Sequence, residues 1–338
     1  MKKYKKERMV NILVLVITII LFLVIAELAF RMVSYRLRGV WCDEDSLDCF
    51  IEKGKSIYSP RLSAYSMEEE EGVFRIAILG DSFTYGFGEE EGKPIKDKAF
   101  PEQLEVLLNN KFDDYKYEVL NFGYPSVTAL EEYFVLKELV LDYNPDLFVL
   151  QITSNDAFSN VYDLNPFTYC DIEFSPAEKR AYWFHKNLKL PGYLYVKLTD
   201  SKTGHYVEKI NPGNPIGGRC FRRSLERIKD VLDEKGIPAF IVYIQDEVSE
   251  KNGEYQIDLE LISEYNQTFA ETGFDYLHTY PYMLESRREV LSDDGYHYNT
   301  KGNLLIAKVI LNHLTEHELV PSCEAQACSL KIINLGVD

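Results

Sequence analysis

Outside its first forty residues the sequence has too few positive side chains to balance the negative ones. Lys and Arg number 37 against 54 Asp and Glu, which gives a formal net charge of −17. The first forty residues carry a net charge of +6, so residues 41–338 carry −23. Because phosphate binding requires a basic surface, this acidic body argues against nucleic acid as a partner.

Several motifs that would indicate a metal or a cofactor are absent. There is no Cys-x-x-Cys and no pair of histidines at ligand spacing beside the cysteines, so we expect no metal site. Gly86-Phe-Gly88 is followed by Glu91 where a dinucleotide-binding fingerprint has its third glycine. We therefore expect no metal or organic cofactor. Internal repeats and low-complexity tracts are also missing, and 46% hydrophobic residues predict a folded chain.

One long apolar run stands near the N-terminus. Met9 to Ala26 is uncharged and mostly aliphatic, and the apolar character continues to Val33 past Glu27. This length suffices to cross a bilayer as a helix, and five cations precede it, which places the N-terminus in the cytoplasm. We interpret residues 1–8 as a cytoplasmic tail and 9–33 as a transmembrane anchor. A cleaved signal peptide is the alternative, although a small-x-small cleavage site is lacking.

Six cysteines fit a domain outside the cytoplasm, where disulfides form. Two pairs are near neighbours in sequence, and the remaining two would pair with each other. The suggested disulfides are Cys42–Cys49, Cys323–Cys328 and Cys170–Cys220. Six cysteines allow fifteen connectivities, so this pairing is a hypothesis.

The body alternates between strand and helix patterns. Apolar runs predict strands over residues 73–79, 117–122, 146–152, 238–244 and 274–278, and helical spacing predicts helices over 101–110, 129–143, 224–235 and 301–314. Such alternation is typical of an α/β domain with a parallel sheet covered on both faces. In these domains the active site lies at the carboxyl ends of the strands.

The remaining segments surround this domain, which we place at residues 73–318. Residues 34–72 are interpreted as a stalk or extension, and 319–338 as a C-terminal tail. A segment at about 158–220 interrupts the alternation and is rich in aromatic residues, so we interpret it as an insertion. Its rings would suit stacking on sugars, but packing of the insertion against the domain is the explanation that we favour.

Chemically useful residues follow the predicted strands. Ser82 comes after the first strand, Gly123 ends the second, Asn155 follows the third, and Asp294 and His297 precede the last helix. Each has an ordinary structural use as a cap, a turn or an exposed loop residue. Together they supply a nucleophile, a base, a residue that orients the base, and oxyanion donors. The first block is not a Gly-x-Ser-x-Gly elbow, because Thr84 replaces the second glycine.

In this order and spacing the blocks resemble the SGNH hydrolases, also called GDSL-like esterases. Gly80-Asp81-Ser82 is similar to their first block, Gly123 to the second, Asn155 to the third, and Asp294-x-x-His297 to the last. Phe100-Pro101, Asn144-Pro145-Asp146 and the segment from Asn299 to Ala307 resemble the membrane-anchored branch of that family. Two positions depart from it: Thr153 stands where the third block has glycine, and Phe83 replaces the usual leucine.

The resemblance implies a three-layer, flavodoxin-like fold with about five parallel strands beside the N-terminal transmembrane helix. It also implies a serine esterase with Ser82, His297 and Asp294 as catalytic triad. Ser82, Gly123 and Asn155 would form the oxyanion hole. Hydrolysis or transfer of a small acyl group, such as acetyl on an extracellular polysaccharide, is the expected activity. A lipid esterase and a non-catalytic binding or scaffold protein that retains the fold are the alternatives.

Overall fold

The computed structural model describes residues 2–38, 47, 51–52, 62–63, 65–68, 70–88, 98–125, 127–157, 169–171, 173, 176, 217–244, 248–251, 254–284 and 287–321. For some of these, namely 2–8, 29–38, 155, 217, 248–251, 254–257 and 287–288, only the backbone is described. The chain divides into two compact units, the first comprising residues 1–44 and 173–207, the second 45–172 and 208–338. Nearly all of what is described in the first unit is one helix, whereas the second unit contains the sheet.

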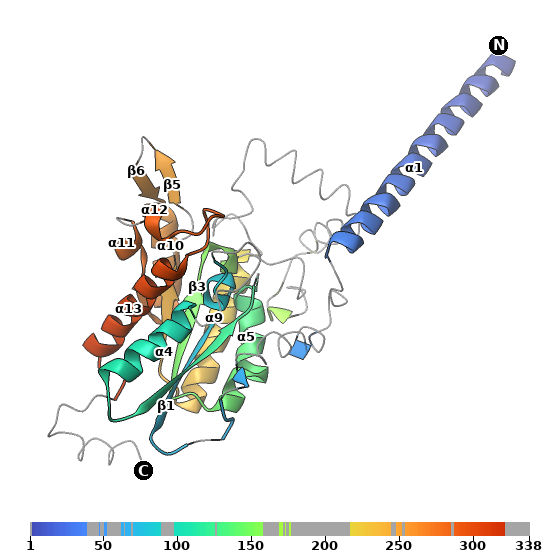
Figure 1. Ribbon diagram of the computed structural model, residues 1–338. Helices are drawn as coiled ribbons and strands as arrows, with labels where there is room; N and C mark the ends of the chain where they lie inside the picture. Colours follow the sequence, from blue (N-terminus) through green and yellow to red (C-terminus); the bar gives the residue numbers. More distant parts are fainter. Residues whose placement is uncertain are drawn as a thin grey trace. The chain divides into compact units, whose positions relative to one another are not determined.

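The second unit is built on a five-stranded parallel sheet with strand order β2-β1-β3-β4-β7 (Figure 1). Its strands are β1 (Val73–Gly80), β2 (Lys116–Gly123), β3 (Leu147–Ile152), β4 (Ala239–Tyr243) and β7 (Asp275–His278). All five predicted strands are present to within one or two residues. Because every strand runs the same way, their carboxyl ends share one edge of the sheet.

Helices cover both faces of the sheet, which confirms the three-layer α/β fold. Ile76 and Ile78 of β1 belong to a core with α4 (Phe100–Lys111) and α13 (Thr300–Glu316). Ala77 and Leu79, which point the other way, belong to a second core. The helices of this second core are α5 (Ala129–Glu138), α9 (Gly217–Lys235) and α10 (Leu259–Glu271).

Short elements complete the second unit. They are the helices α3 (Ser82–Tyr85), η1 (Val140–Tyr143), η2 (Ser154–Ala157), α11 (Tyr280–Met283) and α12 (Arg287–Val290), and a hairpin of β5 (Val248–Lys251) and β6 (Glu254–Ile257). The single helix predicted over 129–143 is divided into α5 and η1 at Leu139. The sequence patterns did not predict the hairpin, α10, α11 or α12.

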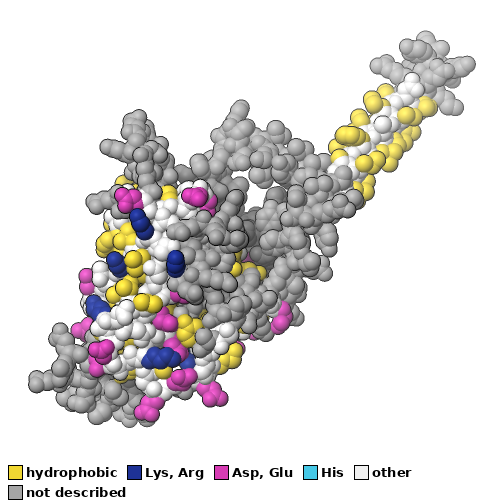
Figure 2. Space-filling model, in the orientation of Figure 1, with side chains coloured by type: hydrophobic (Ala, Val, Ile, Leu, Met, Phe, Trp, Pro, Cys, Tyr) yellow, Lys and Arg dark blue, Asp and Glu magenta, His cyan; other side chains and the backbone are white. Residues whose placement is uncertain are grey.

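The first unit contains the long helix α1 (Lys2–Arg38). Its segment Met9–Leu28 has a mean hydropathy of 3.2, and by length and composition it could cross a membrane. Figure 2 shows apolar side chains along the visible surface of this helix. An apolar helix near an N-terminus is also what a signal sequence would form.

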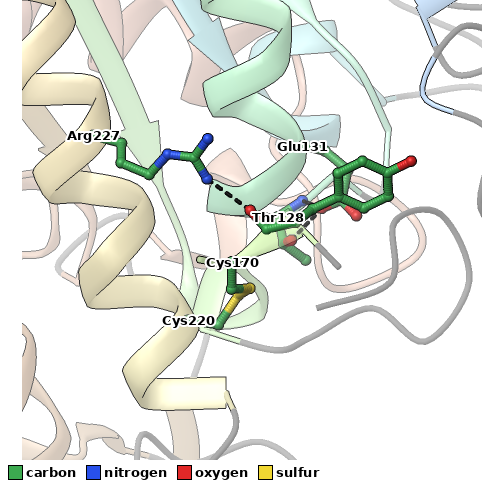
Figure 3. The surroundings of a disulfide bond; sticks show 6 residues. Thr128, Glu131, Cys170, Cys220 and Arg227 are labelled. Atoms are coloured by element: carbon green, nitrogen blue, oxygen red, sulfur yellow. Dashed lines mark hydrogen bonds between the residues drawn. A yellow bond between two sulfur atoms is a disulfide. The ribbon is translucent and has the colours of Figure 1, made fainter. Parts of the chain in front are cut away.

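A disulfide joins the start of the predicted insertion to α9 (Figure 3). Cys170 and Cys220 are both buried and lie 50 positions apart in the sequence. Nearby on α9, the Arg227 guanidinium donates to the Tyr169 carbonyl at 2.7 Å and lies 3.8 Å from the centre of the Tyr133 ring. This pairing confirms one of the three suggested disulfides. The other four cysteines lie outside the described residues, as does most of the insertion.

Removing this disulfide should destabilise the domain. Replacing Cys170 and Cys220 together by alanine releases the loop between them in the unfolded chain, which we expect to lower the free energy of unfolding by about 4 kcal/mol. Urea titration of both proteins, with fitted slopes that agree, would measure the difference. An unchanged stability would show that the segment between the two cysteines is already restricted without the bond.

Candidate active site

Ser82 is the first residue of α3, immediately after β1. Asp81 caps this short helix, and its carboxylate accepts from the Phe83 N–H at 2.9 Å. Gly86 ends the helix at a φ of +80°, a conformation that favours glycine. As the first residue of a helix, Ser82 has an N–H without an acceptor inside the helix. The turn therefore presents both a hydroxyl and an amide at the carboxyl edge of the sheet.

Close packing against β2 and β3 fixes this turn. Gly123, the last residue of β2, lies so near that a Cβ built on it would come within 2.0 Å of the Tyr85 nitrogen. On the other side the Gln151 side-chain oxygen accepts from the Asp81 N–H at 3.1 Å and from the Thr84 hydroxyl at 2.8 Å. Only glycine permits the close approach of residue 123 to the Tyr85 backbone, so there is a steric reason for glycine at this position.

The loop before α13 holds the histidine. Leu291 and Tyr298 form an isolated antiparallel bridge, and the Ser292 N–H donates to the His297 carbonyl at 2.8 Å. Asn299 then caps α13 by accepting from the Lys301 N–H at 2.9 Å. These bonds close the loop at its base, which fixes where the histidine ring lies.

The structure brings Ser82, His297 and Asp294 together. The His297 Nε2 lies 2.8 Å from the Ser82 Oγ, and its Nδ1 lies 2.6 Å from the Asp294 Oδ2. Both distances are those of hydrogen bonds. In this arrangement the carboxylate can hold the proton on Nδ1, which leaves Nε2 free to accept the serine proton.

Several donors surround the Asp294 carboxylate. Its Oδ1 accepts from the Ser292 hydroxyl at 2.6 Å and from the N–H groups of Tyr296 and His297 at 2.8 and 2.9 Å. Partial burial raises the pKa of Asp294, but these bonds and the one to His297 outweigh it and hold the pKa well below its usual range. Asp294 is therefore ionised at neutral pH, as an orienting carboxylate must be.

Aromatic rings surround the histidine. The ring centre of His297 lies 5.1 Å from that of Phe83, 5.4 Å from that of Phe87 and 4.9 Å from that of Tyr296. Phe83, which replaces the usual leucine, also contacts Tyr298. These rings restrict the orientation of the imidazole, and Phe83 belongs to the same turn as Ser82.

The three predicted oxyanion donors differ in what the structure shows of them. The Ser82 N–H lies at the helix start described above. The Gly123 N–H donates to the Asn121 Oδ1 at 2.9 Å, and Asn121 in turn donates to the Thr84 carbonyl. Asn155 lies in η2 beyond β3, but its side chain is outside what the structure describes.

Some residues of the site had no recognisable signal in the sequence. Ser292 binds Asp294 but reads as an ordinary turn residue two positions before it. Glu132 is fully buried under the site, and neither carboxyl oxygen has a hydrogen-bond partner among the described residues. Burial, followed by the charges of Asp156, Asp81 and Glu131, raises the pKa of Glu132 well above its ordinary 4.5. Its surroundings therefore favour the protonated form of Glu132.

Comparisons with known proteins give structural matches only. No family model and no curated protein matches the chain. A lipase/acylhydrolase from Enterococcus faecalis has 17% sequence identity and a TM-score of 0.43, covering 72% of this chain and 96% of its own. The acetyl xylan esterase AlAXEase has 15% identity and a TM-score of 0.45, covering 71% and 100%. A two-domain esterase active on acetylated mannans has 15% identity and a TM-score of 0.44, covering 81% and 55%.

The buried acid predicts a stability difference that depends on pH. Because the folded state raises the pKa of Glu132, its ionisation opposes folding as pH rises above 4.5. We expect the free energy of unfolding of Glu132→Gln, relative to wild type, to increase above pH 4.5 by up to about 1.4 kcal/mol per pH unit. Denaturant titrations at a series of pH values would measure it.

A matched control is Glu138→Gln, on the exposed last turn of the same helix. This variant should show no comparable slope with pH. A Glu132→Gln difference that stays constant between pH 4 and pH 8 would contradict the assignment, because it would mean that Glu132 ionises in the folded protein as it does in the unfolded chain.

Proposed function

We propose that this chain is a serine esterase that hydrolyses or transfers a small acyl group. The observation that supports the proposal most is the pair of hydrogen bonds that links Ser82 to His297 and His297 to Asp294. A serine, a base in contact with it and an ionised group that orients the base are the requirements for nucleophilic acyl transfer.

In the proposed mechanism the Ser82 Oγ attacks the ester carbonyl while the His297 Nε2 takes its proton. Asp294 keeps the Nδ1 proton in place and stabilises the imidazolium that forms. The imidazolium then gives its proton to the leaving alcohol, which departs and leaves an acyl group on Ser82. Water activated by the same histidine releases the acid, and a hydroxyl of another molecule would instead accept the acyl group.

The oxyanion would be stabilised by the Ser82 and Gly123 N–H groups and by the Asn155 side chain. Ser82 fits this role because its amide begins a helix. The Gly123 N–H would have to be shared between the oxyanion and Asn121, which accepts it in the free protein. Neither a metal nor an organic cofactor enters this scheme.

Acetyl esters on polysaccharide are the substrate class we favour for this activity, and lipid esters are the second. The long apolar helix α1 supports the second class, since a membrane anchor would hold the site near a bilayer. A non-catalytic scaffold protein is the third possibility. The hydrogen bonds of His297 to Ser82 and to Asp294 argue against it. Acylated product formed only when free sugar is added would distinguish transferase from hydrolase.

We further infer that α1 is an uncleaved anchor with the N-terminus in the cytoplasm and the second unit outside it. The basic residues before Met9 and the length of the apolar segment support this orientation. The mass of the protein recovered from the membrane fraction would decide between an anchor and a cleaved signal peptide. Loss of the first thirty or so residues would contradict the anchor.

Variants of the site should lose ester hydrolysis without loss of fold. Using an aryl acetate as substrate, we expect Ser82→Ala and His297→Ala to lower kcat by about 10⁴-fold or more. Asn155→Ala should lower it by about 10²–10³-fold if the amide binds the oxyanion. Initial rates, with circular dichroism as a check on folding, would measure these effects.

The results for Ser82→Ala and Asn155→Ala would contradict different parts of the proposal. A Ser82→Ala protein as active as the wild type would contradict the esterase mechanism altogether. An Asn155→Ala loss well below 10²-fold would leave the triad in place and remove Asn155 from the oxyanion hole.

A further inference from the structure

Thr153 occupies the position where the resembling family has glycine. It directly follows β3, is fully buried and lies two residues before Asn155. A glycine at this position would offer only its backbone groups for binding to the surroundings. The threonine adds a hydroxyl and a methyl group, so the substitution changes what holds the loop.

The Thr153 hydroxyl donates across the site to the nucleophile turn. Its Oγ1 lies 3.0 Å from the Asp81 Oδ2, and the other oxygen of that carboxylate accepts from the Phe83 N–H. Asp81 is the residue that caps α3 and immediately precedes Ser82. One hydrogen bond therefore links the loop that carries Asn155 to the turn that carries Ser82.

Thr153 also contacts the acid of its own loop. Its backbone N–H donates to the Asp156 Oδ2 at 2.6 Å, while the Thr153 Oγ1 lies farther from that oxygen, at 3.4 Å. Asp81 and Asp156 are both buried, and two carboxylates in such a place repel each other. Thr153 donates its hydroxyl to Asp81 and its backbone N–H to Asp156. These two bonds favour a fixed distance between the turn that carries Ser82 and the loop that carries Asn155.

A second side chain holds the loop from the opposite direction. The Tyr265 hydroxyl of α10 lies 3.3 Å from the Thr153 carbonyl oxygen and 3.0 Å from that of Ser154. Tyr265 is itself fixed, because it is fully buried and its ring stacks on Tyr243 with centres 4.6 Å apart. The residues just before Asn155 are thus bound on one side to Asp81 and on the other to α10.

We propose that Thr153 is a positioning residue for the reaction, acting through its hydroxyl bond to Asp81. This bond holds the backbone of the loop that carries Asn155 in place relative to the turn that carries Ser82. The inference rests on the proposed esterase function and extends it to a residue outside the triad and the oxyanion hole. The hydroxyl makes this bond, and the volume of the side chain does not contribute to it. Substitutions of nearly the same size can therefore separate the effect of the hydrogen bond from the effect of side-chain volume.

The test compares Thr153→Val, which removes the donor at nearly constant volume, with Thr153→Ser, which retains it. In the full-length chain in detergent, with an aryl acetate, Thr153→Val should lower kcat by about 10- to 100-fold with KM nearly unchanged. Thr153→Ser should stay within about threefold of wild type. Tyr265→Phe should give a loss of the same kind, and melting temperatures would accompany each measurement.

Different results would contradict the positioning role of Thr153 and the proposed esterase function. A Thr153→Val enzyme that matches wild type in kcat would overturn the positioning role while leaving the esterase intact. If Thr153→Val loses kcat together with a large fall in melting temperature, and Thr153→Ser loses kcat as well, Thr153 has only a structural role. Equal activity of wild type and Ser82→Ala would overturn the esterase function, and the positioning role with it.

Discussion

The hydrogen bond between Ser82 and His297 joins residues 215 positions apart, and the rest of the site depends on keeping them in contact. Ser82 is fixed just beyond β1, an inner strand of the sheet, whereas His297 lies on a loop outside the sheet. Their contact therefore requires α13 and the loop before it to be held against the first strand. In the proposed mechanism neither residue acts alone, because a serine hydroxyl without a base is a weak nucleophile.

One buried side chain provides much of this connection. The Asn303 Oδ1 accepts from the Phe100 N–H at the start of α4, at 3.0 Å, and its Nδ2 donates to the Tyr298 and Asn299 carbonyls at 2.9 and 3.0 Å. The histidine loop is thereby bound to α4, which packs on β1 and β2. The apolar core between α4 and α13 supplies the larger stabilisation, and Asn303 fixes the register within it.

The sequence was sufficient for the sheet, the layers and the place of the site. Apolar runs that end in glycine or in small polar residues mark strands, and the carboxyl-edge rule then brings Ser82 and Gly123 to one edge without knowledge of the packing. The sequence could not show that Ser292 binds Asp294, that Thr153 binds Asp81 or that Glu132 is buried. The Ser292 contact depends on the conformation of its own loop, and the other two depend on how segments distant in sequence pack together, which local patterns do not encode. The hairpin β5–β6 was missed because its strands, with sequences VSEK and EYQI, are mostly polar and form no apolar run.

The most direct test of the account is the site at which a fluorophosphonate probe modifies the folded protein, read by mass spectrometry. Such a probe reports an activated serine without requiring the natural substrate. A single adduct on Ser82 that disappears in His297→Ala is the predicted result, because the histidine is what makes the hydroxyl nucleophilic. Failure of the folded wild-type protein to react, or an adduct on Ser82 that persists in His297→Ala, would contradict the claim that these side chains form a working triad.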